Sequence, residues 1–105
     1  MRIRARLDDN HRATRDFLEA HGISIHSTAS MGSGFPDFVW GYRGVSGLLE
    51  LKSTGPRGEL SSGSKRSLKG EQAFAARWRG APVLFATSPE TALSEILYAC
   101  QRARP

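Results

Sequence analysis

The chain has 105 residues, of which 39% are hydrophobic and 24% are charged. These values are close to ordinary globular usage, which excludes a wholly disordered chain and a fibrous repeat. The net charge of +5 excludes an acidic protein and favours a polyanionic partner, with nucleic acid as the natural candidate.

The length fits a single domain over residues 1–105, since typical domains have about 100 to 150 residues. No apolar run approaches the roughly 20 residues that a membrane-spanning helix needs, and the N-terminal residues lack a hydrophobic signal core. We therefore expect an intracellular, cytoplasmic protein with no membrane partner. Cys100 is the sole cysteine, so no internal disulfide can form, and we expect a small apolar side chain on a helix.

The first predicted element is a helix over residues 9–21. Asp8 to Asn10 offer N-cap side chains, and the helix ends at Gly22. Residues 23–26 alternate apolar and polar side chains, which indicates a strand, and residues 27–34 form a glycine-rich loop.

A hairpin is predicted over residues 37–52. Pro36 stands at its entry, where its missing N–H need not join the ladder. Both arms are rich in β-forming residues, and the turn is expected near Arg43-Gly44. The two arms should pair antiparallel.

The second half of the chain begins with residues 53–68, which have the composition of a flexible surface loop. A helix over residues 69–79 should place Phe74 and Trp78 on one face, where we expect both rings in the core. A buried strand at residues 83–86 follows.

The last element is a helix over residues 89–101, with Pro89 at its first position. The elements then follow in the order α-β-β-β-α-β-α. This order predicts an α/β fold with a mixed central sheet.

Charged residues on the second arm of the hairpin suggest chemistry. The period of two along a strand puts Glu50 and Lys52 on one face, and Leu49 and Leu51 on the other. Such a pair is common on solvated strands. Asp37, at the start of the other arm, can however converge with Glu50, although an aspartate after a proline is also an ordinary turn residue.

Two converging carboxylates fit Mg²⁺, which prefers oxygen ligands. Asp37, Glu50 and the backbone carbonyl of Leu51 would bind the ion. A bound metal would acidify an attacking water and neutralise charge on a phosphate, and Lys52 would orient that water or stabilise the transition state.

These residues resemble a known signature. Pro36-Asp37 followed by Glu50-Leu51-Lys52 is similar to the PD-(D/E)xK nuclease motif, and the element order resembles the restriction-endonuclease-like core. Residues 32–44 with residues 48–52 resemble the VRR-NUC branch, the virus-type replication-repair nucleases, which includes small stand-alone phage forms. The resemblance covers roughly residues 8–95.

The resemblance implies a DNA endonuclease that depends on Mg²⁺, with Mn²⁺ as a substitute, and that hydrolyses phosphodiester bonds. It also implies a homodimer, selectivity for branched DNA such as Holliday junctions, and a bacterial or phage-infected host cell. Asp37 and Glu50 would bind the metal, and Lys52 would assist the water.

The family often has further polar residues at two places in the site. On the first helix Asn10 is the best match to this pattern, as an additional metal ligand, and Asp9 is the reserve. On the helix after the long loop, Glu71 and Gln72 are both eligible because the usual motif is altered here, and we favour Gln72 as a catalytic residue.

Basic residues in and after the long loop are predicted to bind the phosphate backbone of DNA: Arg57, Lys65, Arg66 and Lys69. The alternative is a merely solvated loop. The three histidines lack a metal-ligand spacing, and Ser30 and Ser33 lack a context for a serine nucleophile. Trp40 and Tyr42 are candidates either for a dimer contact or for the core.

The leading hypothesis is therefore a metal-dependent DNA endonuclease. The first alternative is a noncatalytic nucleic-acid-binding module with the same fold. A protein that assembles with other subunits through its basic faces is the third, and salt-insensitive partner binding would favour it.

Overall fold

The computed structural model describes the backbone of residues 2–32, 34–52 and 62–103, and the side chains within residues 9–32, 34–52 and 69–103. The elements follow in this order: α1 (Arg2–Ala20), β1 (Ser24–Ser27), the short 3₁₀ helix η1 (Ala29–Met31), β2 (Phe38–Tyr42), β3 (Val45–Leu51), α2 (Ser62–Arg77), β4 (Leu84–Ala86) and α3 (Pro89–Ala103). Apart from η1, this is the predicted order of helices and strands.

The four strands form one mixed sheet in the order β1-β2-β3-β4. β1, β2 and β3 pair antiparallel, and β4 pairs parallel to β3. The chain turns between β2 and β3 at Arg43 and Gly44, whose φ angles are 52° and 82°. Two positive φ angles are what a tight type I′ hairpin turn requires, so the predicted hairpin and its turn are confirmed.

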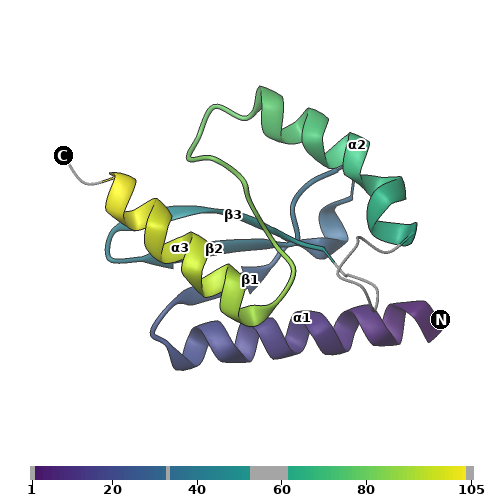
Figure 1. The fold of residues 1–105 in the computed structure, drawn as a ribbon, viewed down its shortest axis with the longest axis horizontal. Coiled ribbons are helices and arrows are strands. Elements are labelled where there is room, and N and C mark those ends of the chain that lie inside the picture. The colour runs from purple at the N-terminus through teal and green to yellow at the C-terminus, as the bar shows by residue number, and fades with distance from the viewer. Residues whose placement is uncertain (1, 33, 53–61, 104–105) are drawn as a thin grey trace.

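The hydrophobic core lies between one face of the sheet and the helices α1 and α3, which also contact each other (Figure 1). It consists of Leu18, Ile23, Phe38, Trp40, Leu49, Leu51, Leu84, Ala86, Ala92, Ile96 and Cys100. Every second residue of β2 and β3 contributes, as the period of two along a strand requires. Trp40 is 2% exposed, so the structure places it in the core rather than at a dimer contact.

Helix α2 lies across the sheet from α1 (Figure 1). It approaches the loop before β2, where Phe35 and Phe74 meet edge to face with ring centroids 5.1 Å apart. The backbones also come close there, because a Cβ at Gly34 would lie 2.9 Å from the carbonyl oxygen of Gly70. A glycine at position 34, with φ of 79°, therefore allows α2 to approach this loop.

Several predicted boundaries were wrong. The first helix begins at Arg2 instead of residue 9, because the N-cap residues at 8–10 lie inside a helix that forms on both sides of them. Residues 62–68 of the loop expected over 53–68 are helical, since α2 begins at Ser62, and residues 53–61 lie outside the described residues. Trp78, expected in the core, is 40% exposed.

Cys100 is buried on α3, as expected, and its thiol donates to the backbone oxygen of Tyr42 at 3.7 Å. Tyr42 itself is partly buried and packs against the core. None of the helices that the structure describes is long and apolar enough to cross a bilayer.

Candidate active site

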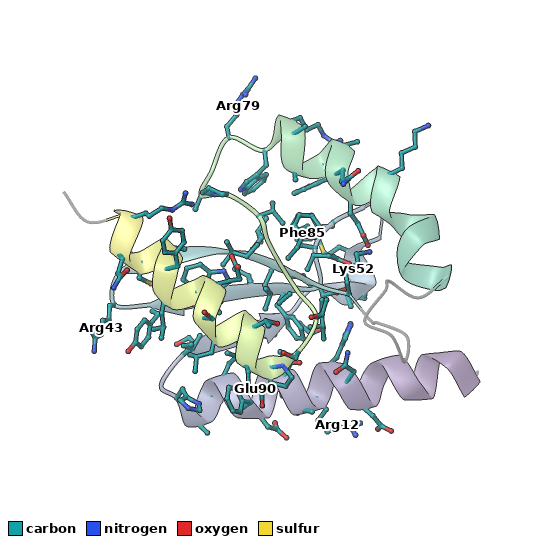
Figure 2. The ribbon with its side chains drawn as sticks, viewed as in Figure 1. Arg12, Arg43, Lys52, Arg79, Phe85 and Glu90 are labelled. Atoms are coloured by element: carbon teal, nitrogen blue, oxygen red, sulfur yellow. The ribbon has the colours of Figure 1, made fainter. Side chains whose placement is uncertain are left out.

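Glu50 and Lys52 extend from β3 on the face opposite the core, as their spacing predicts. Leu49 and Leu51 belong to the core cluster, whereas Lys52 lies on the side of the sheet that faces α2 (Figure 2). Glu50 and Lys52 are each only 4% exposed. The polar face of β3 is therefore covered, and its charged groups interact in a place with little water.

Asp37 stands immediately before β2 and is held against β3. Its Oδ2 accepts a hydrogen bond of 2.9 Å from the backbone N–H of Leu51, the residue between Glu50 and Lys52. Thr28 fixes the same segment from the other side. Its N–H donates to the Asp37 backbone oxygen at 2.6 Å, and its hydroxyl donates to the backbone oxygen of the buried Pro36 at 2.7 Å. The Leu51 N–H thus orients the carboxylate of Asp37, while Thr28 holds the backbone that carries it.

Helix α2 adds Glu71 as a third carboxylate beside Asp37 and Glu50, and these three side chains together with Lys52 form the cluster. The ammonium of Lys52 forms ion pairs with Glu71 Oε1 and with Glu50 Oε2, the latter at 3.5 Å. Gln72, which we favoured from the sequence, is exposed. Successive helical residues are about 100° apart around the axis, so the orientation that directs Glu71 into the cluster turns Gln72 away. The structure favours Glu71 as the residue that α2 contributes.

Helix α1 reaches the cluster through His11, which the sequence did not single out. Its Nε2 lies 3.6 Å from Asp37 Oδ2, and its ring centroid is 5.3 Å from that of Phe38. Asn10, the predicted metal ligand, is partly exposed on the preceding position. Asp9, the reserve choice, is exposed and pairs with Arg12 at 3.2 Å.

A sequence signal for His11 exists in the helical spacing of α1. His11, Thr14 and Leu18 are three and four residues apart, and such positions share one helix face. Thr14 and Leu18 are fully buried, so this face is directed into the protein. A histidine on this inward face of α1 was therefore a better candidate for the site than Asn10, its neighbour in the chain.

The clustered carboxylates perturb one another. Burial raises the pKa of Glu50 to about 10, assisted by a hydrogen bond with Glu71 and by the charges of Asp37 and Glu71, while Lys52 opposes the shift. Burial also raises the pKa of Asp37, which the Leu51 N–H partly offsets. Among the described residues, three carboxylates therefore meet around the Lys52 ammonium, and their mutual repulsion favours the protonated form of Glu50.

A divalent cation suits this donor set. Among the described residues, the buried Glu50 Oε1 has no hydrogen-bond partner, and unsatisfied buried oxygens of this kind require an explanation such as a bound ion. Asp37 and Glu50 supply the hard oxygen ligands that Mg²⁺ prefers. As the side chains stand, the described part of the chain contains no group of three or more His, Cys, Asp or Glu residues set to hold an ion. The fit of the site to a divalent cation therefore rests on Asp37 and Glu50.

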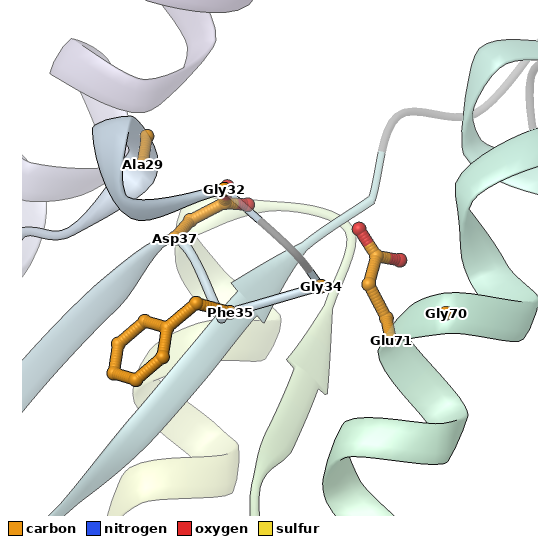
Figure 3. Close-up of a pocket in the computed structure, with 7 residues that line it drawn as sticks. All are labelled: Ala29, Gly32, Gly34, Phe35, Asp37, Gly70 and Glu71. Carbon is orange, nitrogen blue, oxygen red and sulfur yellow. The ribbon is translucent and has the colours of Figure 1, made fainter.

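A pocket of about 410 Å³ opens beside the cluster (Figure 3). It is lined by Ala29, Gly32, Gly34, Phe35, Asp37, Gly70 and Glu71. Three of these residues are glycines, so a ligand can approach the backbone closely. Asp37 and Glu71 face the pocket, so a ligand in it would meet two of the clustered carboxylates.

Of the residues predicted to bind DNA, Lys69 is exposed on α2, one position before the pocket residue Gly70. The side chains of Arg57, Lys65 and Arg66 lie outside the described residues.

Among the residues predicted from the motif, Asp37, Glu50 and Lys52 converge, and Leu51 lies between them with its N–H bound to Asp37. Comparison with protein-family models, with curated proteins and with solved structures finds no match to this chain. Any functional assignment therefore depends on the residues of the cluster and on their geometry.

Proposed function

We propose that the protein is a DNA endonuclease that depends on Mg²⁺, with Mn²⁺ as a substitute, and that has a restriction-endonuclease-like core of the VRR-NUC branch. One observation carries the proposal. Asp37, Glu50 and Lys52, which occupy the motif positions in the sequence, meet beside a pocket on the polar face of a mixed sheet. A purely structural role does not require two neighbouring carboxylates with raised pKa values, whereas functional sites often collect such groups.

In this proposal Asp37 and Glu50 hold the metal, with the backbone carbonyl of Leu51 as a further oxygen ligand. A bound divalent cation supplies positive charge at a scissile phosphate and acidifies an attacking water. The hydrogen bond from the Leu51 N–H fixes one oxygen of Asp37. His11 supports the same carboxylate from α1 and is a positioning residue.

Lys52 has the second role. Its ammonium can orient the attacking water or stabilise negative charge that develops on the phosphate. Glu71 pairs with Lys52 and so positions the ammonium, while its own carboxylate reaches the pocket. This assignment replaces Gln72 with Glu71.

DNA is the polyanion that fits the net charge of +5. Lys69 is exposed on α2, one position before the pocket residue Gly70, and in this proposal it contacts a phosphate, a role that we extend to Arg57, Lys65 and Arg66. A homodimer would present two such sites to two strands of a branched DNA such as a Holliday junction.

The second candidate is a noncatalytic nucleic-acid-binding module. Its support is the burial of Lys52 and its pairing with Glu71, because a buried ion pair between β3 and α2 would also serve to hold the helix on the sheet. In that case the carboxylates would have no metal to bind, and DNA binding would not depend on a divalent cation.

Cleavage assays separate the two candidates. Purified protein is incubated with linear duplex, single-stranded, flap and four-way-junction DNA in Mg²⁺, Mn²⁺ or EDTA. Glu50→Gln and Lys52→Met are compared with Glu95→Gln, an exposed position on α3. Metal-dependent cutting that both cluster variants lose and the control keeps supports the nuclease; DNA binding without cutting in any metal supports the binding module.

A further inference from the structure

Three aromatic rings lead from the pocket along α2. Phe35 lines the pocket and meets Phe74 with ring centroids 5.1 Å apart. Phe74 in turn stacks on Trp78, at 5.4 Å and with 21° between the ring planes. The row therefore runs from the candidate active site to the C-terminal end of α2.

Trp78, the last ring of the row, is partly exposed and also packs against the protein. Phe74 is 8% exposed, whereas Trp78 keeps 40% of its surface in solvent. The chain after the helix also packs against the indole, because a Cβ at Gly80 would lie 2.7 Å from Trp78 Nε1. Phe74 and the backbone at Gly80 thus hold the indole in place, while 40% of its surface stays open to a ligand.

Two arginines flank Trp78 in the sequence, Arg77 and Arg79. The guanidinium of Arg77 lies 5.2 Å from the centre of the Phe74 ring, and Arg79 points outward at the edge of the molecule (Figure 2). Residues 72–89 contain no acidic residue, so the sequence next to the two arginines is uniformly basic or neutral. An exposed aromatic ring with an arginine on either side of it in the chain matches what unpaired nucleotides need, since bases stack on the ring and phosphates pair with the cations.

We propose that Trp78, with Arg77 and Arg79, binds the unpaired nucleotides of a single-stranded DNA segment next to the pocket. In a duplex both faces of each base are already stacked, so the ring favours unpaired bases. That this segment belongs to the DNA being cut rests on the proposed nuclease function, whereas the binding itself does not. The site selects DNA in which a single-stranded stretch, such as a flap or an opened junction, adjoins the cleavage point.

Binding is measured with the full chain in EDTA, so that no cutting interferes. The probe is a labelled oligothymidylate followed by anisotropy, with a blunt duplex of equal length as competitor. Trp78→Ala should weaken binding about tenfold, within the range known for stacking aromatics, and Trp78→Phe should retain most of it. Tyr98→Ala is the matched control: Tyr98 is 57% exposed on α3, and the Arg102 guanidinium lies 5.0 Å from its ring centre.

Intrinsic fluorescence gives a second readout that needs no variant. Trp40 is buried and Trp78 is exposed, so the quencher acrylamide should reduce mainly the emission of Trp78. Stacking of thymine on Trp78 should quench this same part of the emission. Quenching by the oligonucleotide at constant protein concentration supports the proposal. If the emission is instead quenched as the protein concentration rises without DNA, Trp78 lies in a contact between copies of the protein, and the proposed DNA site is overturned.

Other outcomes also overturn the inference: equal affinity of Trp78→Ala and wild type, equal weakening by Tyr98→Ala, preference for the duplex, or preference for an RNA strand of the same length. If the protein cuts DNA but Trp78→Ala binds the oligonucleotide as tightly as the wild type, only this inference is refuted. Binding that depends on Trp78, without cutting in any metal, refutes the proposed nuclease alone.

Discussion

Replacing Glu50 by glutamine should stabilise the protein in EDTA, and increasingly so as pH rises. Burial, more than any other cause, raises the pKa of Glu50 from 4.5 to about 10 in the folded protein. Because the folded pKa is the higher one, the contribution of this group to stability is fully present below about pH 4.5 and is lost as pH rises towards 10. A glutamine keeps the shape of the side chain and has no proton to release.

The magnitude follows from the pKa difference. Between the two pKa values, unfolding releases about one proton from Glu50, which lowers the free energy of unfolding by about 1.4 kcal/mol for each pH unit. From pH 5 to pH 8 the wild type should therefore lose on the order of 4 kcal/mol relative to Glu50→Gln.

Urea denaturation in EDTA at several pH values within this range measures the difference. Glu95→Gln changes the same functional groups at an exposed position on α3 and should follow the wild type. Stability curves for wild type and Glu50→Gln that stay parallel from pH 5 to pH 8 would refute the raised pKa and the crowding of carboxylates on which it depends.

Three further predictions concern the surroundings of the cluster. Gly34→Ala should cost about 1–3 kcal/mol more than Gly32→Ala in urea denaturation, because both positions have positive φ but only the Cβ at 34 meets backbone; equal costs would contradict the close approach of α2. His11→Ala should weaken Mn²⁺ binding about tenfold by calorimetry, as loss of a group that orients a ligand does, whereas His21→Ala should not; an unchanged Kd for the first variant would remove its positioning role. Lys52→Met should destabilise the protein by about 3 kcal/mol near pH 7, since it leaves a buried carboxylate unpaired. Thermal or urea unfolding with no loss of stability would show that the ion pair is not structural.

The face of β3 that carries the cluster was predictable from sequence alone. Side chains along a strand alternate strictly, so Leu49 and Leu51 had to occupy the face opposite Glu50 and Lys52. The turn at Gly44 was equally local, because a tight hairpin turn needs residues that accept positive φ. Asp37 then meets β3 as a consequence of the hairpin register.

The contributions of the helices were harder to predict. Whether α2 presents Glu71 or Gln72 depends on how the helix is rotated, and close approach at Gly34 accompanies that rotation. Helix propensity contains no information about it. The helical spacing of α1 places His11 with Thr14 and Leu18, but only the packing of α1 in the folded protein brings this face to Asp37.

The extent of α2 and the exposure of Trp78 were also missed. Serine and glycine at the start of α2 are typical of loops, yet residues 62–68 are helical. Trp78 has the spacing of a core residue relative to Phe74, but α2 ends at Arg77 and the ring remains at the surface. Spacing identifies a shared face without saying whether another element covers it.

Cleavage by Asp37→Asn tests the central claim most directly. The variant removes one charge from the carboxylate that the Leu51 N–H orients, and Asp16→Asn makes the same change at an exposed position on α1. With the best DNA substrate in Mn²⁺, wild type and Asp16→Asn should cut at the same rate, while Asp37→Asn should bind the DNA and leave it intact. Equal cutting by Asp37→Asn would contradict the proposed active site.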